Sequence, residues 1–443
     1  MHEFPATSRQ RWYFDANTDG WSTLNVPVIF DLVEYHERAV HAALQALVER
    51  HDALRTTLHR RGVDVVQHVS TGGEVPLTEE SFTGTSSELQ NTILSFLDEP
   101  FQVHGGALVR ARLLRRGTQA NVLMLSVHHA VCDGWSAGLL QRDFVALYQA
   151  EAQQVEAALP ALELQFPDYA TWEWQLACEE PPGFWRQWLA SGHPRMRLGG
   201  TEAAEGRPGV FRSIPLPAIP AETAKDMDSL AAEWRTTPAN IVTAAVGSSL
   251  VPVFGKRLTI GVFAGNREQP ELLDVVGDLA DRIPIPIDAT DTPTFGELVK
   301  RVSGCLAHAR DNYTPMAALA PLIRANPERS AGPLLDVTVN YLPHRTRLHG
   351  RDTAGHLECG LVAEIDPALE LRSFRADRWG DGFGLLDFQH RPQADGGIGG
   401  YLLYNSAVVP EESARELAAT TNAAIARFVA EPALRVSELA TSF

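Results

Sequence analysis

The residues best suited to chemistry lie together in one short segment, residues 128–134, with the sequence HHAVCDG. Two adjacent imidazoles, His128 and His129, precede the carboxylate of Asp133 and the small residue Gly134. A neutral imidazole can take a proton from a hydroxyl or an amine, and a nearby carboxylate can orient the ring or fix the loop by pairing with an arginine. Glycine lets a ligand approach the backbone closely. The segment therefore predicts a site where one imidazole deprotonates or positions a protic nucleophile.

Two regular elements flank this segment and must position it. Residues 121–129 (NVLMLSVHH) are apolar on both faces, as expected of a strand that is buried on both sides. Ser136 can cap a following helix, whose apolar residues recur at helical spacing up to Tyr148. Because adjacent side chains on a strand point to opposite faces, only one of the two histidines can face a given cavity, and the other must be held in the scaffold.

Three other interpretations of the segment stay open from the residues alone. The histidines can be structural, beside an ordinary Asp-Gly turn. Metal binding is disfavoured because adjacent strand residues diverge and no further His, Cys or Asp set has ligand spacing, so no metal is expected. Cys132 could in principle be acylated, although a small apolar filler is the favoured interpretation and no GxSxG nucleophile motif occurs.

The composition is that of a folded protein with an acidic balance. The chain has 443 residues, of which 44% are hydrophobic and 21% charged, so extensive disorder is excluded and two or three domains are expected. With 38 basic and 55 acidic residues the formal charge is −17, which argues against nucleic-acid or membrane-surface binding. Four widely spaced cysteines, no secretory signal and no run of about eighteen apolar residues favour a reduced, cytoplasmic protein that does not span a membrane.

Helices and strands are mixed in a similar way in both halves of the chain, which permits two related lobes. A Gly- and Pro-rich stretch at residues 191–209 looks like a linker or exposed loop. In the second half, helices are expected near residues 221–235 and after Thr237, and one amphipathic helix over the last thirty residues. Two further strands are expected around the Gly-rich turn within residues 380–405.

The motifs, taken together, resemble a known family. The segment HHAVCDGWSAGLL is similar to the HHxxxDG core motif of the condensation domains of nonribosomal peptide synthetases. Residues 7–12 (TSRQRW) resemble the opening motif SxAQxRLW, with Arg9 in place of Ala, and residues 50–58 (RHDALRTTL) resemble RHExLRTxF, with Asp52 in place of Glu. Similar segments follow in the family's order, namely residues 164–172, 261–267, 277–284 and 337–343.

The resemblance implies an α/β (α+β) fold of two lobes, each similar to chloramphenicol acetyltransferase, in a V-shaped pseudo-dimer with a central tunnel. The N-terminal lobe, which carries the HHxxxDG motif, is expected at residues 1–175 and the C-terminal lobe at residues 176–443. A floor loop and a latch from the second lobe are expected to cross back, and residues 380–405 are the candidate latch. A donor arm and an acceptor would enter the tunnel from opposite mouths.

The resemblance also implies a reaction. An acyl or aminoacyl group, held as a thioester on the phosphopantetheine arm of a carrier protein, would pass to the hydroxyl or amine of an acceptor. His129 would position or deprotonate that nucleophile, and His128 would support the loop. Gly134 would leave room for the thioester, and its N–H could face the developing oxyanion. No cofactor is expected on the enzyme itself.

The carboxylate of the motif has a structural role in this comparison. Asp133 would pair with a buried arginine, with Arg55 as the first choice of partner and Arg282 as the second. Breaking such a pair on one side costs several kcal/mol, so loss of Asp133 is expected to harm folding as well as rate.

Departures from the family's pattern narrow the subtype. Both histidines are present, whereas heterocyclising relatives carry aspartates there and inactive recruiting relatives lose the second histidine. The motif continues as DGWSAG and not as the DGVSW of epimerising relatives. Residues 279–286 (LADRIPIP) stand where the family has FVNTLPLR, with Asp281 and Arg282 in place of Asn-Thr. This departure argues against the usual acceptor, a second carrier-bound amino acid.

The expected partners follow from the same comparison. One condensation unit accounts for about all 443 residues and no Gly-Gly-His-Ser carrier signature occurs, so a free-standing enzyme with a separate carrier protein as donor is expected. Free-standing bacterial relatives in antibiotic and other natural-product pathways, including enediyne assembly, join an aminoacyl group to a soluble alcohol or amine. A soluble acceptor is therefore preferred over a second carrier protein, and the product would be an ester or an amide.

The surface that would receive the carrier protein has one candidate. Carrier proteins are generally acidic, as this chain is, so docking would need a local basic or apolar patch. Arg110, Arg112, Arg115 and Arg116 could form a basic one, unless they protect an exposed strand edge.

Two other function classes remain as alternatives. An acyl-CoA-dependent acyltransferase on a similar fold also uses a histidine before an aspartate, although the order of motifs along the whole chain argues against it. A non-catalytic docking module that recruits a partner to a synthetase is the third class. The intact His128 and His129 argue against it.

Overall fold

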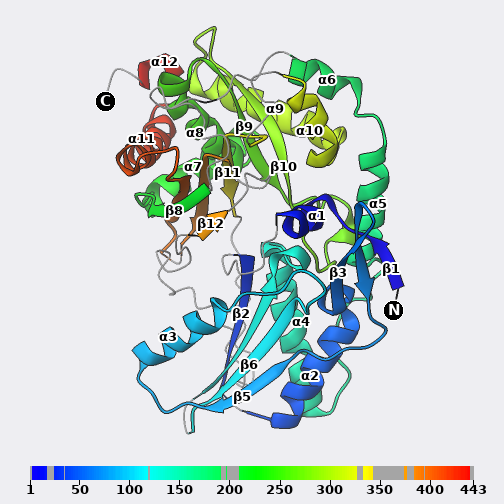
Figure 1. Cartoon of the computed structure of the whole chain (residues 1–443). Coiled ribbons are helices and arrows are strands. Elements are labelled where there is room, and N and C mark those ends of the chain that lie inside the picture. The colour runs from blue at the N-terminus through cyan, green and yellow to red at the C-terminus, as the bar shows by residue number, and fades with distance from the viewer. Residues whose placement is uncertain are drawn as a thin grey trace. The chain divides into compact units, whose positions relative to one another are not determined.

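The computed structural model describes residues 2–16, 24–33, 35–117, 120–190, 196, 209–326, 333–342, 374–376, 384–393 and 395–439. These residues form two compact units (Figure 1). Unit 1 takes its described residues from Met1–Leu176 and Gly265–Ala280, and unit 2 from Ala177–Ala264, Asp281–His344 and Pro367–Phe443. The segment Gly265–Ala280 therefore belongs to unit 1, although the chain on both sides of it belongs to unit 2.

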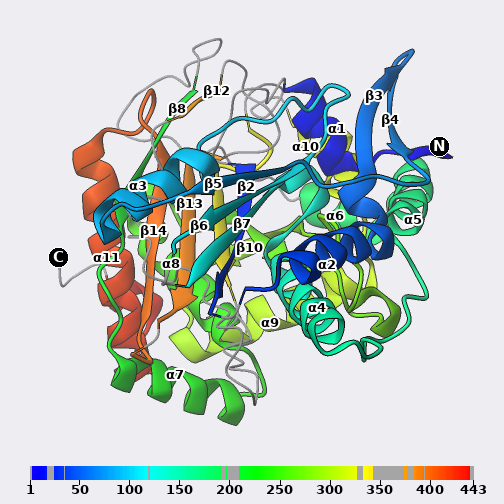
Figure 2. The same cartoon turned by 90° about the horizontal axis from the view of Figure 1, so that it is seen from below.

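A four-stranded sheet forms the centre of unit 1, in the order β2-β7-β6-β5. Its strands are β2 (Asn25–Leu32), β7 (Asn121–His128), β6 (Val109–Arg115) and β5 (Leu77–Ser81), and only the β5–β6 pair is parallel. All residues of β7 are buried, because α3 (Ser86–Leu97) packs on one face of the sheet and α4 (Gly134–Gln153) on the other (Figure 2). The predicted strand with two buried faces is thus confirmed.

Smaller elements complete unit 1. Helix α2 (Glu37–Arg50) packs against α4. A second sheet, in the order β1-β4-β3, joins β1 (His2–Pro5), β4 (Asp64–Val69) and β3 (Thr56–Arg61). Helix α1 (Ser8–Asp15) lies between β1 and β2 in the chain. A reciprocal capping box between Thr7 and Gln10 caps its N-terminus. Helix α5 (Phe166–Cys178) leads out of the unit. The chain leaves unit 1 after Leu176, one residue beyond the lobe boundary expected from the sequence.

Unit 2 is built on a seven-stranded sheet with the order β10-β9-β11-β13-β14-β8-β12. The strands are β8 (Gly209–Pro215), β9 (Arg257–Ala264), β10 (Asp281–Asp288), β11 (Val337–Tyr341), β12 (Phe374–Ala376), β13 (Leu386–Pro392) and β14 (Ile398–Asn405). Pro284 and Pro286 are tolerated in β10 because this strand is at the edge of the sheet.

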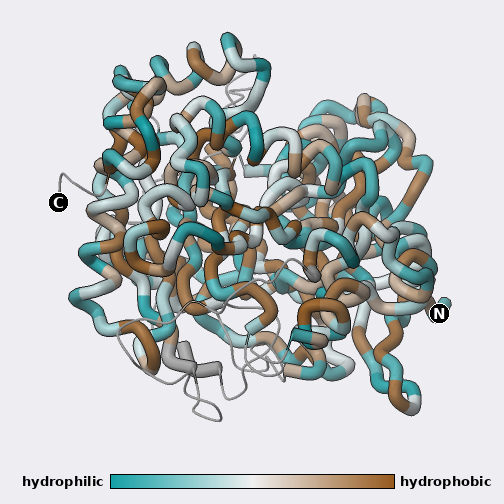
Figure 3. Tube along the Cα trace, turned by 90° about the horizontal axis from the view of Figure 1, so that it is seen from above, coloured by the Kyte–Doolittle hydropathy of each residue, from teal (hydrophilic) through white to brown (hydrophobic). Residues whose placement is uncertain are grey.

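One hydrophobic core joins this sheet to the helices of unit 2. The helices are α6 (Gly183–Ala190), α7 (Ala221–Glu233), α8 (Pro238–Phe254), α9 (Phe295–Asp311), α10 (Met316–Arg324), α11 (Glu411–Ala430) and α12 (Val436–Leu439). Figure 3 shows polar and apolar residues alternating along many helices, as expected of elements that bury one face. Within the described ranges, no single helix is long and apolar enough to cross a membrane, but α7 and α8, bent by 106° between them, pass that test as a pair on length and composition.

The structure of unit 2 differs in part from what the sequence predicted for this half of the chain. The single helix expected over the last thirty residues is wrong, because α11 ends at Ala430, just before Pro432, and α12 follows. Most of the linker expected at residues 191–209 lies outside the described residues, as do residues 380–383 of the candidate latch. The described remainder of that latch forms β13 and β14 of the unit 2 sheet. The V-shaped arrangement, the tunnel and the crossing of the latch stay predictions.

Candidate active site

The HHxxxDG segment lies in unit 1 at the junction of a strand, a single turn and a helix. Strand β7 ends at His128, a 3₁₀ turn covers His129–Val131, and α4 begins at Gly134. This order of a strand, a loop and a helix is the one predicted around residues 128–136. The predicted cap is wrong, however, because Asp133 and not Ser136 caps α4, and Ser136 lies in the first turn of the helix. Both flanking elements are packed into the core of the unit, so the turn between them is held by rigid structure.

His128 is fully buried and holds the turn. Its Nδ1 accepts a hydrogen bond of 3.0 Å from the backbone N–H of Ala130, which assigns the ring proton of the neutral imidazole to Nε2. The rings of Tyr13 and Phe101 meet the imidazole edge-on, with centroids 5.5 and 5.9 Å away. These contacts give His128 a scaffold position.

His129 has the opposite character. Its side chain is 30% exposed, so it alone of the two adjacent imidazoles is accessible. The Nδ1 atom lies 3.4 Å from Oδ2 of Asp278. Asp278 belongs to Gly265–Ala280, which comes back to unit 1 from later in the chain and is called the returning segment below. The Tyr13 ring lies at a tilt, 6.1 Å from the imidazole between centroids.

Asp278 is a buried carboxylate surrounded by donors. Its Oδ2 accepts hydrogen bonds from Arg9 Nε at 2.8 Å and from the Tyr13 hydroxyl at 3.0 Å. Burial raises the pKa of Asp278, but the charges and hydrogen bonds of Arg9 and His129 outweigh it, and the pKa falls to about 2. The carboxylate is therefore ionised at neutral pH although its side chain is inaccessible to solvent.

Asp133 caps α4 and joins it to the returning segment. Oδ1 accepts the N–H of Ser136 at 2.7 Å, and Oδ2 accepts the N–H of Leu279 at 3.3 Å. Both oxygens also accept from Nη2 of Arg267, at 3.2 and 3.1 Å, and both side chains of this ion pair are only 5% exposed. Asp133 thus forms a buried ion pair that ties the start of the helix to residues 265–280.

The choice of arginine partner made from the sequence is wrong. Arg55 pairs with Asp52, three residues earlier on the same 3₁₀ turn, and donates to the carbonyl of Ser70. Arg282 lies on β10 in unit 2, where its charge acts to lower the pKa of the buried Asp387. The partner of Asp133 is Arg267. Because the two residues are 134 positions apart, no local sequence pattern indicates this pair.

Backbone and side-chain bonds fix the returning segment on α4. The hydroxyl of Ser136 donates to the carbonyl of Gly277 at 2.8 Å and accepts its N–H at 3.0 Å. The backbone N–H of Asp133 also donates to that carbonyl, at 3.1 Å. A side chain at Gly277 would collide with Phe166, whose Cδ2 lies 2.2 Å from the position of a Cβ atom. Glycine is therefore required here for the segment to approach unit 1 closely.

Gly134 and Cys132, the other two candidate residues of the segment, differ in their exposure to solvent. Gly134 is exposed and is the first residue of α4, whose hydrogen-bond ladder begins with the N–H of Ala137, so the Gly134 N–H has no acceptor within the helix. Cys132 is fully buried and its Sγ lies 3.5 Å from the carbonyl oxygen of Asp133. This burial favours the filler interpretation over an acylated thiol.

Four functional neighbours of His129 and Asp133 were not assigned from the sequence, namely Arg9, Tyr13, Arg267 and Asp278. Three of them lie in segments that resemble family motifs, residues 7–12, 261–267 and 277–284, and Tyr13 follows the first. One signal was available, since Arg9 replaces an alanine of the opening motif and a buried arginine requires an anionic partner. The identity of that partner depends on the path of residues 265–280.

The four arginines proposed as a docking patch are largely occupied by neighbours. Arg110 donates to the carbonyl of Glu99 and lies over the Phe101 ring, and Arg112 pairs with the Glu99 carboxylate at 2.6 Å. Arg115 pairs with Glu79. The strand-edge alternative is wrong, because β6 has a neighbour on each side. The charges of Arg110, Arg112 and Arg115 are thus compensated by neighbouring carboxylates.

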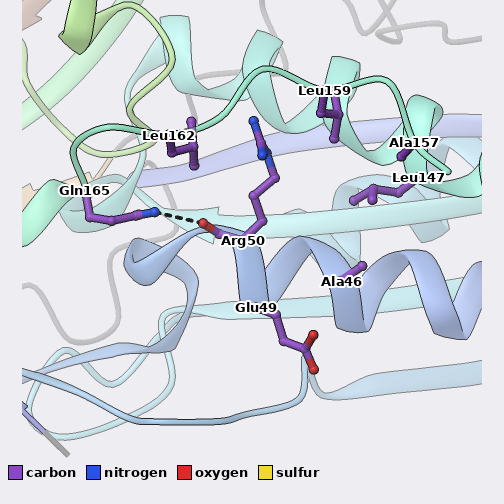
Figure 4. A pocket seen from close by; sticks show the side chains of 8 residues that line it. All are labelled: Ala46, Glu49, Arg50, Leu147, Ala157, Leu159, Leu162 and Gln165. Carbon is purple, nitrogen blue, oxygen red and sulfur yellow. Dashed lines mark hydrogen bonds between the residues drawn. The ribbon is translucent and has the colours of Figure 1, made fainter.

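A separate cavity of about 450 Å³ lies between α2, α4 and residues 157–165 (Figure 4). Gln165 donates to the backbone carbonyl of Arg50 at its rim, at 3.0 Å. It shares no lining residue with the HHxxxDG site. The described residues also hold no cluster of three or more His, Cys, Asp or Glu side chains suited to a metal ion.

Comparison with known proteins extends over the whole chain. The sequence model of the condensation domain family matches residues 1–442. A phosphinothricin tripeptide synthetase, PhsC, from Streptomyces viridochromogenes is 30% identical over 318 residues, which cover 67% of this chain and 28% of that protein. The curated relatives are thus much longer, and this chain spans at most 28% of the length of those compared.

Two solved structures show the same fold. The X-domain and OxyB complex from teicoplanin biosynthesis matches with a TM-score of 0.75 and 22% identity, over 99% of this chain and 96% of that one. SgcC5 from Streptomyces globisporus, solved with a naphthyl ethanediol and sucrose, matches with a TM-score of 0.73 and 21% identity, over 97% and 100%. The expected α+β, acetyltransferase-like fold class is confirmed. With the match of the family model along residues 1–442, these findings establish that the chain belongs to the condensation domain family.

Proposed function

We propose that this protein transfers an acyl or aminoacyl group from the phosphopantetheine thioester of a carrier protein to a hydroxyl or amine, with His129 as the base or positioning group. The observation that carries the proposal is the contrast between the two histidines. His128 is buried and its Nδ1 is occupied by a backbone N–H, whereas His129 is 30% exposed beside a buried carboxylate. Only His129 can meet a substrate.

The proposed reaction needs one proton acceptor and one oxyanion donor. The nucleophile attacks the thioester carbonyl while its proton passes to His129, and collapse of the intermediate breaks the C–S bond and returns that proton to the departing thiolate. A new C–O or C–N bond forms. The N–H of Gly134, which has no acceptor within α4, is suited to bind the oxyanion. Because the acyl group arrives activated as a thioester, the proposal requires no resident cofactor.

A soluble alcohol or amine is the acceptor we prefer. Asp281 and Arg282 replace the Asn-Thr of the family motif, and Asp281 is buried in unit 2, where it accepts the N–H of Met316 at 2.8 Å. A motif altered in this way favours an acceptor other than a carrier-bound amino acid. The complex of SgcC5 with a naphthyl ethanediol favours a diol as the first acceptor to test.

A docking module without catalysis is the second candidate. It is favoured by the similarity of fold to the X-domain, whose structure is a complex with OxyB. The accessible His129 beside an ionised carboxylate argues for chemistry instead, since a docking surface has no need for such a pair.

Intact-mass spectrometry of acyl-loaded carrier proteins tests the proposal. A panel of carriers loaded with aminoacyl or acyl groups is incubated with the protein and with soluble diols and amines, and acyl-CoA thioesters are offered in parallel. Loss of the acyl group to a new product, abolished by His129→Ala, is expected with carriers and not with acyl-CoA. Turnover with acyl-CoA alone would establish the acyl-CoA transferase class. Unloading that His129→Ala does not change would overturn the role of the histidine, and no unloading with any pair would favour the docking module.

A further inference from the structure

We infer that Asp278, held by Arg9, is a positioning residue that fixes the tautomer of His129, so that Nε2 is the atom that meets the acceptor. The inference deepens the proposed function and rests on it for its catalytic meaning. The assignment of the tautomer itself depends only on the folded protein.

The two histidines are set in opposite tautomers by their neighbours. His128 accepts a backbone N–H at Nδ1, so its proton lies on Nε2. Nδ1 of His129 instead faces an oxygen of Asp278 at 3.4 Å. A carboxylate that is ionised can only accept, so the favourable neutral form of His129 carries its proton on Nδ1 and leaves the lone pair on Nε2. An imidazole so oriented presents a base at the far side of the ring.

The two oxygens of the Asp278 carboxylate have different surroundings. Oδ2 is shared by Arg9, Tyr13 and His129, while Oδ1 is buried without a hydrogen-bond partner among the described residues. A buried carboxylate oxygen without a donor is costly. Closure of the 3.4 Å gap, or formation of the imidazolium, would strengthen the interaction of the ring N–H with this carboxylate at the moment of proton transfer.

Arg9 makes the buried charge tolerable. An isolated carboxylate in this position would take up a proton, but the guanidinium of Arg9 at 2.8 Å supplies the compensating charge. Arg9 stands where the family's opening motif has alanine, and its guanidinium contacts the carboxylate beside the histidine. The two residues lie 269 positions apart in the sequence.

Asp278, Arg9 and Tyr13 form one group of contacts beside His129. An oxygen of Asp278 faces Nδ1 of His129, and the same oxygen accepts from Arg9, whose charge keeps the carboxylate ionised. Tyr13 donates to Asp278 as a neutral phenol, because burial above all, and then Asp278, keep its pKa well above its usual value despite Arg9. The imidazole of His128 lies edge-on to the Tyr13 ring. Removal of Asp278 or of Arg9 therefore takes the same ionised carboxylate away from Nδ1 of His129.

Nitrogen-15 NMR of histidine-labelled protein tests the inference without any substrate, with the His129 signals assigned by their loss in His129→Gln. In the unaltered protein, His129 is expected to carry its proton on Nδ1 at high pH. In Asp278→Asn the Nε2-protonated neutral form is expected to gain at the expense of the Nδ1-protonated form. Arg9→Gln removes the cation that keeps Asp278 ionised, so it should move the tautomer ratio in the same direction as Asp278→Asn. An unchanged tautomer in Asp278→Asn, or an Nε2-protonated His129 in the unaltered protein, would overturn the inference.

A matched control separates positioning from general loosening of the segment. Asp274 lies on the same returning segment and pairs with Arg142 at 2.5 Å, away from His129. Asp274→Asn should leave the tautomer of His129 unchanged. If the tautomer shifts as expected while no carrier–acceptor pair is turned over, the proposed function fails and the assignment of Asp278 stands.

If turnover is found, Asp278→Asn should lower kcat by about 100-fold or more with a smaller effect on KM. An unchanged kcat would remove Asp278 from the mechanism, whatever the proposed function.

Discussion

Replacement of Asp133 is expected to release the returning segment from α4. The loss of free energy can be worked out from the contacts of Asp133. In Asp133→Asn the amide oxygen can still cap the helix through the N–H of Ser136, since asparagine is as good a cap as aspartate. The charge, however, is lost, and the guanidinium of Arg267 stays buried at 5% exposure without its counterion.

The magnitude follows from the two interactions involved. Breaking a buried ion pair by removing one partner costs about 3–5 kcal/mol. Asp133→Ala loses the helix cap as well, which adds about 1 kcal/mol, for an expected cost of about 4–6 kcal/mol. Arg267 retains the carbonyls of Leu272 and Val275, each at 2.7 Å, which places Asp133→Asn toward the lower end of its range.

Hydrogen exchange read by mass spectrometry suits the measurement, because the two units need not unfold together and a single melting temperature would mix them. Peptides that cover residues 265–280 and the start of α4 report the opening free energy of this connection. Peptides from β13 and β14 in unit 2 serve as an internal reference and should not change.

Asp274→Asn is the matched comparison, since it breaks another ion pair of the same segment. Both side chains of the Asp274–Arg142 pair are 31% exposed, so its loss should cost at most about 1 kcal/mol. If Asp133→Asn opened residues 265–280 no more readily than Asp274→Asn does, the assignment of a buried, structurally necessary pair to Asp133 and Arg267 would be refuted.

Further predictions concern unit 2 and the close approach in unit 1. Burial, opposed only weakly by Asn422, lowers the pKa of His390 to about 4. The stability from its neutral form is complete above the usual pKa of histidine and is lost as pH falls through about 4. The free energy of unfolding, measured by urea titration, should therefore fall between pH 7 and pH 4 by about 3 kcal/mol less in His390→Leu than in the unaltered protein. Burial raises the pKa of Asp387 to about 6, and the stability that its protonated form provides at low pH is lost as pH rises through about 6. Asp387→Asn should therefore stabilise unit 2 by about 1–3 kcal/mol at pH 8 and little at pH 4, and an equal effect at both would contradict the titration. Gly277→Ala should destabilise unit 1 by about 1–3 kcal/mol or more through the collision with Phe166, detectable as faster exchange in residues 265–280, whereas relief by Phe166→Leu in the double variant would confirm the cause.

The regular elements on either side of the site could be predicted from the sequence. The apolar run before His128 predicted a strand buried on both faces, and a helix was predicted to follow the Asp-Gly pair. The predicted cap, Ser136, lies three residues after the actual cap, Asp133. Such signals depend on periodicity and capping, which are properties of neighbouring residues. The same reasoning placed the last helix too far toward the C-terminus, because the periodic pattern continues past Pro432 while the helix ends at Ala430.

The contacts that complete the site could not be found in this way. Arg267 and Asp278 lie on a segment whose return to unit 1 leaves no periodic signal in the sequence. Arg55 was the nearer arginine with a motif of its own, but an aspartate three residues away on the same turn takes its charge. Arg9 was visible as a departure from a motif, yet its partner could be named only from the fold.

The grouping of residues 265–280 with the first 176 residues has a consequence for synthesis and for engineering. As the chain leaves the ribosome, the two histidines and Asp133 emerge long before the arginine and the carboxylate that hold them, so α4 must wait for its counterion until much of unit 2 has been translated. A chimaera that exchanges only the N-terminal half between related domains would pair one parent's helix cap with the other parent's returning segment. The natural module for recombination is therefore discontinuous, and residues 265–280 should be transplanted together with residues 1–176.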